Sequence, residues 1–270
     1  MIGLIRFSYP ALGGFKINHP DTQARIDYLY SPKRLEERFK HFELLTLPAL
    51  RLQTDPDFRL VVVTGEALPA NAFTRLQSLL ANIPQAVIVQ MPPMRHRTAM
   101  HEAVLAQLPN PDAPSIQFRL DDDDAVAVDF VERTRLAALA VQPLTLVHPY
   151  VGLDFMQGHY VELSPQGVHL APALRPCLGV ALSIIAPPNP KRTILTYGHH
   201  KLPEKMPVLS FSDSAMYLNS KHAHNDSMRG AAHEAGMPLA LEVEEKMLHQ
   251  RFGVDASSVR QIMSGAHDKA

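Results

Sequence analysis

Four consecutive aspartates, Asp121 to Asp124, are the residues of this chain whose type and spacing point most directly to chemistry. They follow an apolar segment at 116–120, which has the composition of a buried strand. Hard divalent cations such as Mg²⁺ and Mn²⁺ bind carboxylate oxygens, and a cation held in this way can bridge the phosphates of a substrate. If the chain stays extended, strand alternation sends Asp121 and Asp123 to one side and Asp122 away from it.

A structural role is the alternative for the aspartate run. A helix is expected from about residue 128 to 140, and acidic residues are favoured at helix N-termini by the helix dipole. That interaction contributes only about 0.3–1 kcal/mol per charge. Capping needs one or two carboxylates, whereas four adjacent ones repel each other. We therefore expect a metal site here, with Mg²⁺ or Mn²⁺ as the cation.

Two histidines two residues apart, His222 and His224, form a second group that could do chemistry. Imidazole is a good ligand for Mn²⁺ or Zn²⁺ and a weaker one for Mg²⁺. The prediction is that one of the two contacts the metal or a phosphate. The chain contains 14 histidines, so a surface turn without function is the alternative for this pair.

Basic residues near predicted strand ends are candidates for binding a phosphate, since ligands of open α/β sheets bind outside the carboxyl ends of the strands. Arg97 lies at a strand-to-helix connection, where a guanidinium suits a phosphate, although a solvated basic loop would have the same sequence. His200 and Lys201 could reach a pyrophosphate or lie in an exposed loop.

The first half of the chain alternates strand and helix patterns that would position these residues. Pro32 marks a helix start, because serine at position 31 can cap a helix and proline is tolerated at its first position. We expect strands at 2–7, 58–64, 86–90 and 116–120, and helices from 32 to about 45 and at 69–82, 98–108 and about 128–140. Helices between short apolar strands predict parallel crossover units, hence an α/β sheet with both faces covered.

After Pro143 the pattern changes to short strand-like pieces separated by turns, at 144–147, 151–156 and 160–163. The segment at 172–207 is rich in proline and gives no clear pattern. Late strands are expected at 208–211 and 216–218, and a helix at 239–251. We expect a single domain over residues 1–270 with an elaborated C-terminal half.

Composition excludes several classes of protein. Hydrophobic residues make up 46% of the chain and charged residues 20%, which is enough for a sizeable core and excludes disorder of the whole chain. The net charge of -1 gives no reason to expect a nucleic acid or an anionic membrane as a partner. The single cysteine, Cys177, cannot form an intrachain disulfide, so we expect a reducing compartment and a buried thiol.

The longest apolar stretch, at 178–186, is about half as long as the roughly 20 residues that span a bilayer. We therefore expect a soluble, cytoplasmic protein without a transmembrane segment. Peripheral association with a membrane would leave no trace of this kind and stays open.

The wider pattern resembles a family of bacterial rhamnosyltransferases, which are glycosyltransferases of the GT-A fold. The matching segments cover most of the chain between residues 28 and 227 and comprise Tyr28-Leu29-Tyr30, Leu35-Glu36-Glu37-Arg38-Phe39, Gln53-Thr54-Asp55-Pro56-Asp57-Phe58, the aspartate run, and His222-Ala223-His224-Asn225-Asp226-Ser227. The run itself resembles the Asp-X-Asp motif of these enzymes. The resemblance implies a Rossmann-like mixed sheet with a nucleotide-binding half at about 1–125 and an acceptor-side half at about 126–270.

The resemblance also implies roles for single residues. Asp121 would contact the ribose of a nucleotide-sugar donor, and Asp123 would bind the metal with Asp124 in support. A late histidine often completes the metal sphere of GT-A enzymes, and the histidine pair resembles it in position. Tyr9 and Thr64 end the first two predicted strands, where a GT-A fold places the nucleotide.

The function implied is a metal-dependent glycosyltransferase that moves a sugar such as rhamnose from a nucleotide diphosphate donor to a saccharide or lipid-linked acceptor. The metal would neutralise the leaving diphosphate, and in an inverting enzyme a carboxylate takes the proton of the acceptor hydroxyl. Asp213 is the candidate base, because it follows a predicted strand and precedes the histidine motif, as the base does in similar inverting enzymes. An ordinary Asx turn is the alternative at Asp213, and Asp154 is the rival base.

Two other functions stay open from the sequence. A metal-dependent phosphoryl- or nucleotidyl-transferase also uses carboxylate-held Mg²⁺. Phosphatases with an Asp-X-Asp nucleophile place it on the first strand, however, and this chain has no Gly-X-X-X-X-Gly-Lys phosphate loop. A non-catalytic module for nucleotide sugar or calcium would bind metal without turnover.

Overall fold

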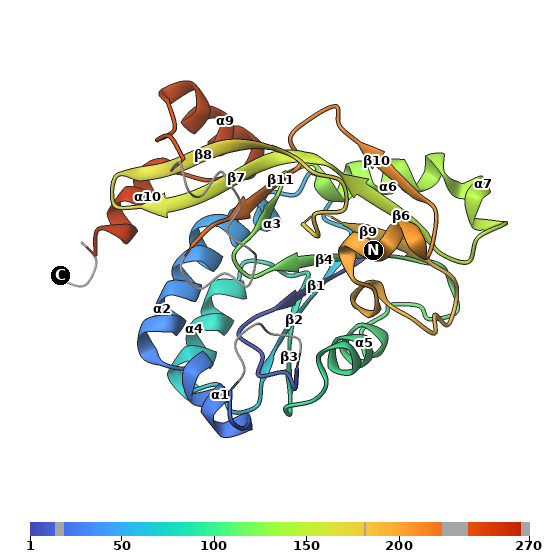
Figure 1. Ribbon diagram of the computed structural model, residues 1–270, viewed down its shortest axis with the longest axis horizontal. Helices are drawn as coiled ribbons and strands as arrows, with labels where there is room; N and C mark the ends of the chain where they lie inside the picture. The colour runs from blue at the N-terminus through green and yellow to red at the C-terminus, as the bar shows by residue number, and fades with distance from the viewer. Residues whose placement is uncertain (14–18, 181, 223–236, 266–270) are drawn as a thin grey trace.

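The computed structural model describes residues 1–13, 19–180, 182–222 and 237–265, which form a mixed α/β fold with two sheets (Figure 1). Within these residues the larger sheet has seven strands in the order β10-β6-β9-β4-β1-β2-β3. They are β1 (Ile2–Arg6), β2 (Arg59–Gly65), β3 (Ala86–Met91), β4 (Ser115–Asp121), β6 (Val151–Phe155), β9 (Ser183–Ala186) and β10 (Val208–Phe211). The helices of the first 150 residues are α1 (Thr22–Leu29), α2 (Pro32–His41), α3 (Leu47–Arg51), α4 (Ala70–Leu80), α5 (His96–Ala106), α6 (Phe130–Ala140) and α7 (Gln142–Thr145).

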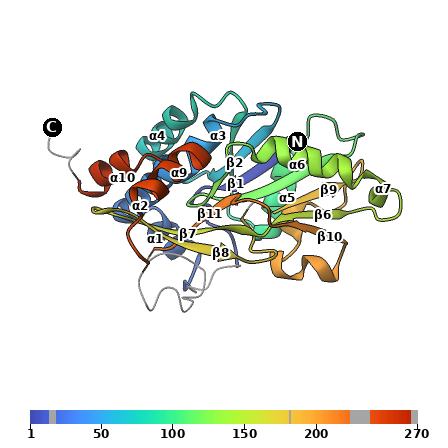
Figure 2. The same cartoon turned by 90° about the horizontal axis from the view of Figure 1, so that it is seen from above.

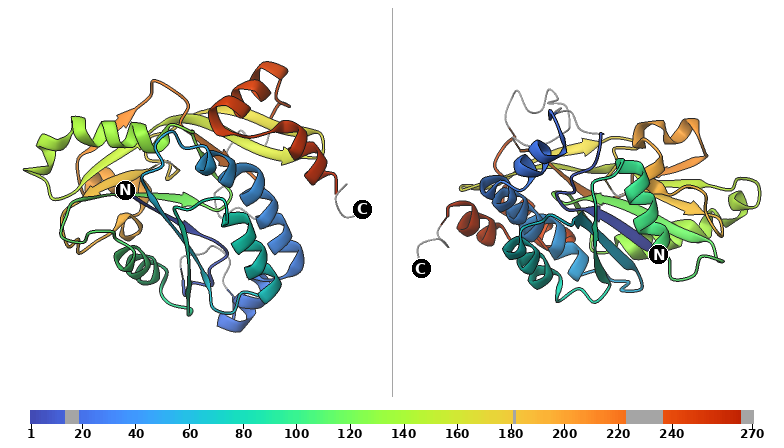
Figure 3. Two further views of the ribbon diagram at one scale, coloured as in Figure 1. Left: turned by 180° about the vertical axis from the view of Figure 1, so that it is seen from behind. Right: turned by 90° about the horizontal axis from the view of Figure 1, so that it is seen from below.

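Strands β1 to β4 are parallel, with β1 between β2 and β4 and with β3 at the edge beside β2. Neighbouring residues of a strand face opposite sides of the sheet. Ile5 belongs to the same buried cluster as Leu76 of α4, whereas Leu4 belongs to the cluster of Met100 of α5. Helices therefore cover both faces, as the sequence predicted, with α5 on one side and α2 and α4 on the other (Figures 1 and 3).

The helix predicted from residue 32 to about 45 is present as α2, which continues through a π turn (Phe42–Thr46) into α3. Its apolar stripe is buried, namely Leu35, Phe39, Phe42 and Leu45. Pro32 occupies the start of the helix, but the Ser31 hydroxyl donates to the carbonyl of Tyr28 (3.0 Å) and makes no capping hydrogen bond.

The second half differs from the sequence predictions in several places, and the hairpin strand at 167–174 and the helix at 256–263 were not predicted. Residues 144–147 are not a strand: they lie in α7 and the turn after it, because Pro143 starts a short helical turn there. Strand β9 comes from the proline-rich segment that gave no pattern, and it lies antiparallel between β4 and β6. This strand makes the large sheet mixed.

A second sheet among the described residues has four strands in the order β5-β11-β7-β8. They are β5 (Ala125–Val126), β7 (Gln157–Ser164), β8 (Gly167–Leu174) and β11 (Tyr217–Ser220). Helix α10 (Ala256–Met263) lies against the β7–β8 hairpin, and α9 (Glu242–Phe252) lies against α3 (Figure 2). Because β5 follows the aspartate run directly, the run connects the two sheets.

The segment between β9 and β10 contains two 3₁₀ helices, Ile194–Thr196 and His199–Glu204. None of the described helices is long and apolar enough to cross a membrane.

Candidate active site

A cleft of about 380 Å³ lies where β1 and β4 end. The side chains that line it come from both sheets, from α2 and α5, and from loops: Arg6, Arg38, His96, Arg119, Asp121, Asp122, Asp123, Asp124, Leu178, Gly179, Val180, His199, Asn219 and Lys221. Ligands of open α/β sheets bind at this edge. The aspartate run thus lies at the strand end where the sequence predicted it.

Asp121 is the last residue of β4 and lies beside Arg6, the last residue of β1, in the register of the two parallel strands. Its Oδ1 is 3.9 Å from the Arg6 guanidinium, and 44% of its side chain is exposed to the cleft and solvent. The chain then turns, because the amide of Asp124 donates to the carbonyl of Asp121 (3.3 Å). The strand alternation considered for an extended chain does not apply beyond Asp121, and Asp122 also lines the cleft.

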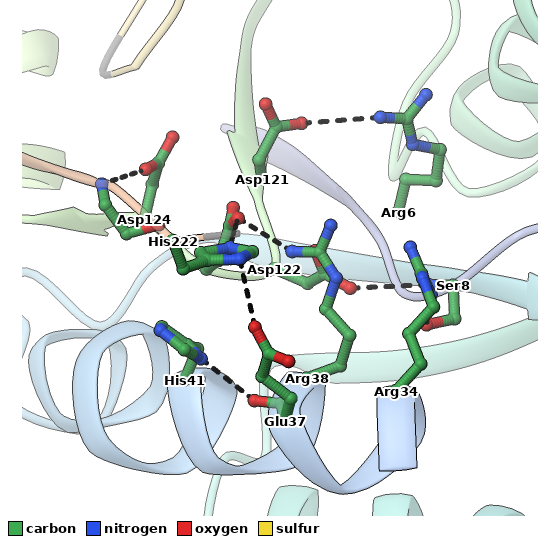
Figure 4. Close-up of polar contacts among 12 residues, drawn as sticks. Arg6, Ser8, Arg34, Glu37, Arg38, His41, Asp121, Asp122, Asp124 and His222 are labelled. Carbon is green, nitrogen blue, oxygen red and sulfur yellow. Dashed lines mark hydrogen bonds and ion pairs between the residues drawn. The ribbon is translucent and has the colours of Figure 1, made fainter. Parts of the chain in front are cut away.

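Arg38 of α2 holds the middle of the aspartate run (Figure 4). Its Nη1 is 2.7 Å from Oδ2 of Asp123 and 3.2 Å from Oδ1 of Asp122. The amide of Ser8, which has a left-handed backbone (φ 46°), donates to Oδ2 of Asp122 (3.3 Å). Burial alone would lower the pKa of Arg38, but the two aspartates outweigh burial and raise it. Arg38 therefore stays charged and neutralises the buried part of the run.

His222 contacts the same aspartate from the other side. Its Nε2 is 2.7 Å from Oδ2 of Asp123, and its Nδ1 is 3.2 Å from Oε1 of Glu37. Burial would lower the pKa of His222, but the hydrogen bonds to Asp123 and Glu37 raise it. Burial likewise would raise the pKa of Asp123, but Arg38 and His222 hold it below its usual range. His222 thus faces two carboxylates that favour its charged form, and its ring lies tilted against that of His41 with ring centroids 4.5 Å apart.

Asp124 connects the aspartate run to the second sheet through hydrogen bonds. Its Oδ1 accepts hydrogen bonds from the amide of Ser220 (2.8 Å) and from Nδ2 of Asn219 (3.0 Å), both in β11. Burial, with Asp123 and Asp121 nearby, raises the pKa of Asp124 well above its usual value. This environment therefore favours an Asp124 carboxyl that is protonated or bound to a metal ion over an ionised carboxylate without a bound cation.

Cationic groups face the aspartates across the cleft. Arg119 lies two residues before the end of β4, next to Leu4 of β1, on the face that α5 covers. His96 begins α5, and its pKa is lowered to about 3 by burial and by Arg6 and Arg119. Its buried Nε2 has no hydrogen-bond partner among the described residues. The cleft therefore combines carboxylates with guanidinium groups and a neutral imidazole.

Carboxylate oxygens are the donor atoms of the cleft that a hard cation would bind. Within the described ranges, no group of three or more His, Cys, Asp or Glu side chains is arranged to hold a metal ion. Mg²⁺ is usually held by one or two protein carboxylates and completes its sphere with water and substrate phosphates. The aspartate run is therefore better suited to a cation that binds together with a diphosphate than to a cation held by protein ligands alone.

Most of the other residues considered for binding a nucleotide lie outside the cleft lining, and their proposed roles stay predictions. Tyr9 is buried and its hydroxyl donates to the carbonyl of Pro92 (2.6 Å). Thr64 is fully buried, and the residues considered for the phosphates, Arg97, His200 and Lys201, are exposed. His199, next to the pair at 200–201, does line the cleft. His224 lies outside the described residues.

The two candidate bases have different surroundings, and neither lines the cleft. Asp213 is 61% exposed on the connection from β10 to β11, where it is ion-paired with Arg133, whose hydrogen bond lowers its pKa. Asp154 is fully buried in β6, and burial raises its pKa. Its Oδ2 accepts from the amide of Cys177 (2.9 Å) and the hydroxyl of Ser210 (3.0 Å). Asp154 thus supports the loop that continues into the cleft wall at 178–180.

Cys177 is buried, as predicted, and burial raises its pKa to about 11. Its backbone is left-handed (φ 51°), and its carbonyl lies 2.7 Å from Nδ1 of His199.

Arg38, Glu37 and Asn219 are site residues that the sequence did not single out for chemistry. Two signals were available for Glu37 and Arg38: they lie in one of the segments that resemble the family, and the pairs Arg34 and Arg38, and Glu37 and His41, are four residues apart and so lie on neighbouring positions of α2. Asn219 had no such signal.

The chain is a glycosyltransferase: residues 1–234 match the family described as "Putative rhamnosyl transferase", and the chain belongs to that family. No curated protein matches the chain in sequence.

Similar solved structures include S. aureus TarS residues 1–349, with 12% identity, a TM-score of 0.42, and coverage of 81% of this chain and 60% of that chain. The complex of TarS 1–349 with UDP-GlcNAc has 12% identity and a TM-score of 0.42, with 98% of this chain and 70% of that chain covered. In the first of these comparisons the chain thus spans about three fifths of the TarS segment.

Proposed function

We propose that this glycosyltransferase uses a nucleoside diphosphate sugar as donor and moves the sugar, a deoxyhexose such as rhamnose, to a saccharide or lipid-linked acceptor. The observation that carries the proposal is the cleft at the ends of β1 and β4, in which the aspartate run faces Arg6 and Arg119. The family assignment supports the class of sugar.

The cationic side of the cleft suits the diphosphate. A leaving diphosphate carries developing negative charge, and fixed cations in a partly desolvated cleft stabilise that charge. Arg6, Arg119 and Lys221 line the cleft together, and His96 places the start of α5 beside them. A helix N-terminus with no acidic residue in its first turn adds favourable dipoles for an anion.

The carboxylate side suits a divalent cation, Mg²⁺ or Mn²⁺, which would act as a Lewis acid toward the diphosphate when bound. Asp123 and Asp124 are the residues proposed to hold it, with Asp121 on the donor ribose. Arg38 and His222 both contact Oδ2 of Asp123, so Oδ1 is the oxygen proposed for the cation. Arg38 and His222 would then fix the orientation of this carboxylate, as partners of metal-binding groups commonly do.

The acceptor hydroxyl needs a base, and Asp213 is kept as the proposed one, with Asp154 as its rival. Asp213 is exposed and could approach an acceptor, but in its ion pair with Arg133 it is a weak base. Breaking that pair on acceptor binding would raise the pKa of Asp213 toward its ordinary value. Asp154 has the raised pKa of a base but is enclosed by its hydrogen bonds to the cleft-wall loop.

The proposal is tested by ligand-dependent thermal stability with a panel of nucleoside diphosphate sugars, each with Mg²⁺ or Mn²⁺. A ligand that binds the folded state alone stabilises it by RT ln(1 + [L]/Kd), about 2.7 kcal/mol at a hundredfold excess over Kd. We expect at least one deoxyhexose donor to raise Tm, and more so with the metal. If no donor stabilises the protein under any condition, the proposed donor class is wrong.

A further inference from the structure

His199 lines the cleft, and the proposed function gives it no role. It begins the 3₁₀ helix His199–Glu204 and shares the cleft with Arg119 and Asp121. Its Nδ1 lies 2.7 Å from the carbonyl oxygen of Cys177. Because a carbonyl oxygen only accepts hydrogen bonds, Nδ1 carries the proton in this contact. The second ring nitrogen, Nε2, makes no hydrogen bond within the described part of the chain.

The ring is neutral near pH 7, so Nε2 is an acceptor. Burial, with Arg119 and His200 nearby, lowers the pKa of His199 below its ordinary value of 6.5. A neutral imidazole with its proton on Nδ1 has an unshared electron pair on Nε2. Such a nitrogen accepts a hydrogen bond from a hydroxyl group, but it cannot donate one to a phosphate oxygen. His199 therefore differs in chemistry from the arginines of the cleft, which suit the diphosphate.

The loop against which His199 packs fixes the position of its ring. Cys177 has a left-handed backbone (φ 51°), and Gly179 has a φ of 105°. A Cβ atom at Gly179 would lie 3.2 Å from Cγ of His199, so a larger residue there would crowd the ring. Oδ2 of Asp154, which is fully buried, accepts a hydrogen bond from the amide of Cys177 (2.9 Å). Asp154, Cys177 and His199 thus form a chain of hydrogen bonds from β6 to the cleft.

We propose that Nε2 of His199 accepts a hydrogen bond from a hydroxyl group of the sugar that the donor carries, and that Asp154 positions the ring through Cys177. The inference rests on the proposed function, because it needs a nucleoside diphosphate sugar in the cleft. The diphosphate offers only acceptor oxygens, and the ribose is assigned to Asp121. The hydroxyl groups of the sugar are the donors next to the diphosphate that still need a protein acceptor.

Titration calorimetry in the presence of Mg²⁺ tests the proposal. The probes are the rhamnose esters of uridine, thymidine and guanosine diphosphate, each compared with the free nucleoside diphosphate. His199→Asn is the decisive variant, because an asparagine amide can replace Nδ1 as the donor to Cys177 but offers no acceptor at the position of Nε2. We expect it to weaken binding of an ester about tenfold, which is about 1.4 kcal/mol, and to leave binding of the free diphosphate unchanged.

Two variants of Asp154 separate a positioning role from that of a base. Asp154→Ala removes the acceptor of the Cys177 amide and should weaken binding of the ester but not of the free diphosphate. Asp154→Asn keeps a carbonyl oxygen at this place and should bind both like the unmodified protein. A base acts on the acceptor hydroxyl, so neither variant would change donor affinity if that were the role of Asp154. Should Asp154→Ala fail to fold, His199→Asn still tests the contact with the sugar.

His249→Asn is the matched control, because His249 is exposed on α9 and lies outside the cleft lining. It makes the same replacement and should change neither affinity. Equal losses for ester and free diphosphate in His199→Asn, or no loss for either, would overturn the inference and leave the proposed function standing. If the unmodified protein binds none of the esters, the proposed donor sugar is wrong and the inference falls with it.

Discussion

Replacing Arg38 with alanine should destabilise the protein by about 3–5 kcal/mol near neutral pH, because it removes the guanidinium that pairs with two buried carboxylates. Arg38 is 11% exposed, and Asp122 and Asp123 are 6% and 8% exposed, so solvent screens these contacts little. For a chain of this size about 2–4 °C of Tm corresponds to 1 kcal/mol, so Tm should fall by roughly 6–20 °C.

The loss of stability in Arg38→Ala should be smaller at low pH than at high pH. The folded state holds the pKa of Asp123 below its ordinary value. The stability that Asp123 contributes is therefore present above the pKa of the unfolded chain, about 4, and is lost as the pH falls through the folded-state value. Without Arg38, both carboxylates can relieve their burial by binding protons. Arg38→Ala should thus be less destabilising at about pH 5 than at about pH 8.

Urea unfolding at the two pH values measures this effect. Arg75→Ala is the matched control, because Nη1 of Arg75 is 2.5 Å from Oε2 of Glu36 in a pair that is 35% and 48% exposed. Such an exposed pair contributes about 0–1 kcal/mol. The double variant Arg38→Ala with Asp123→Asn should lose less than the sum of the two single variants. The reasoning fails if Arg38→Ala costs no more than the control or costs the same at both pH values.

Three further predictions concern the cleft. Asp123→Asn should abolish metal-dependent donor binding while the fold stays intact, because an amide is a poorer ligand for a hard cation; unchanged donor affinity with metal present contradicts this. His222→Ala should lower the free energy of unfolding more at about pH 6 than at about pH 9. The folded state raises the pKa of His222, so its contribution to stability is complete below the pKa of the unfolded chain, about 6.5, and is lost as the pH rises through the pKa of the folded state. Urea unfolding that shows equal losses at both pH values would refute it. Arg119→Ala should weaken binding of a nucleoside diphosphate about tenfold or more in calorimetry, whereas Arg97→Ala, outside the cleft lining, should change it less; equal effects would restore Arg97 as a phosphate ligand.

Strands β1 and β2 could be predicted because they are buried on both faces of the sheet. Residues 60 to 63 form a run of Leu and Val without interruption, and each of these side chains is fully buried. Strand β9 was not predicted, because it lies among the prolines of the segment at 172–207, and its pairing partners β4 and β6 are distant in sequence. The segment at 144–147 has strand-like composition, but Pro143 and the absence of a neighbouring strand leave it helical and exposed.

The position of the aspartate run could likewise be predicted, because a strand end is a local property of the chain. Its partner Arg38 could not, because that contact joins residues 85 apart in sequence and depends on how α2 packs beside β4. The charge state of His222 also depends on this packing, which places Glu37 and Asp123 at its two ring nitrogens. The identity of the base depends on the acceptor side of the cleft, to which neither Asp213 nor Asp154 contributes a lining side chain.

Release of nucleoside diphosphate from a panel of donor sugars, with Mg²⁺ or Mn²⁺ and with a chelator, is the measurement that tests the central claim most directly. Slow hydrolysis is expected even without acceptor, since water can occupy the acceptor position. We expect that at least one nucleoside diphosphate deoxyhexose is cleaved, that the metal increases the rate, and that Asp123→Asn abolishes the increase. If no donor is cleaved at any metal concentration while simple phosphate esters are hydrolysed, the cleft performs phosphoryl transfer and the account is wrong.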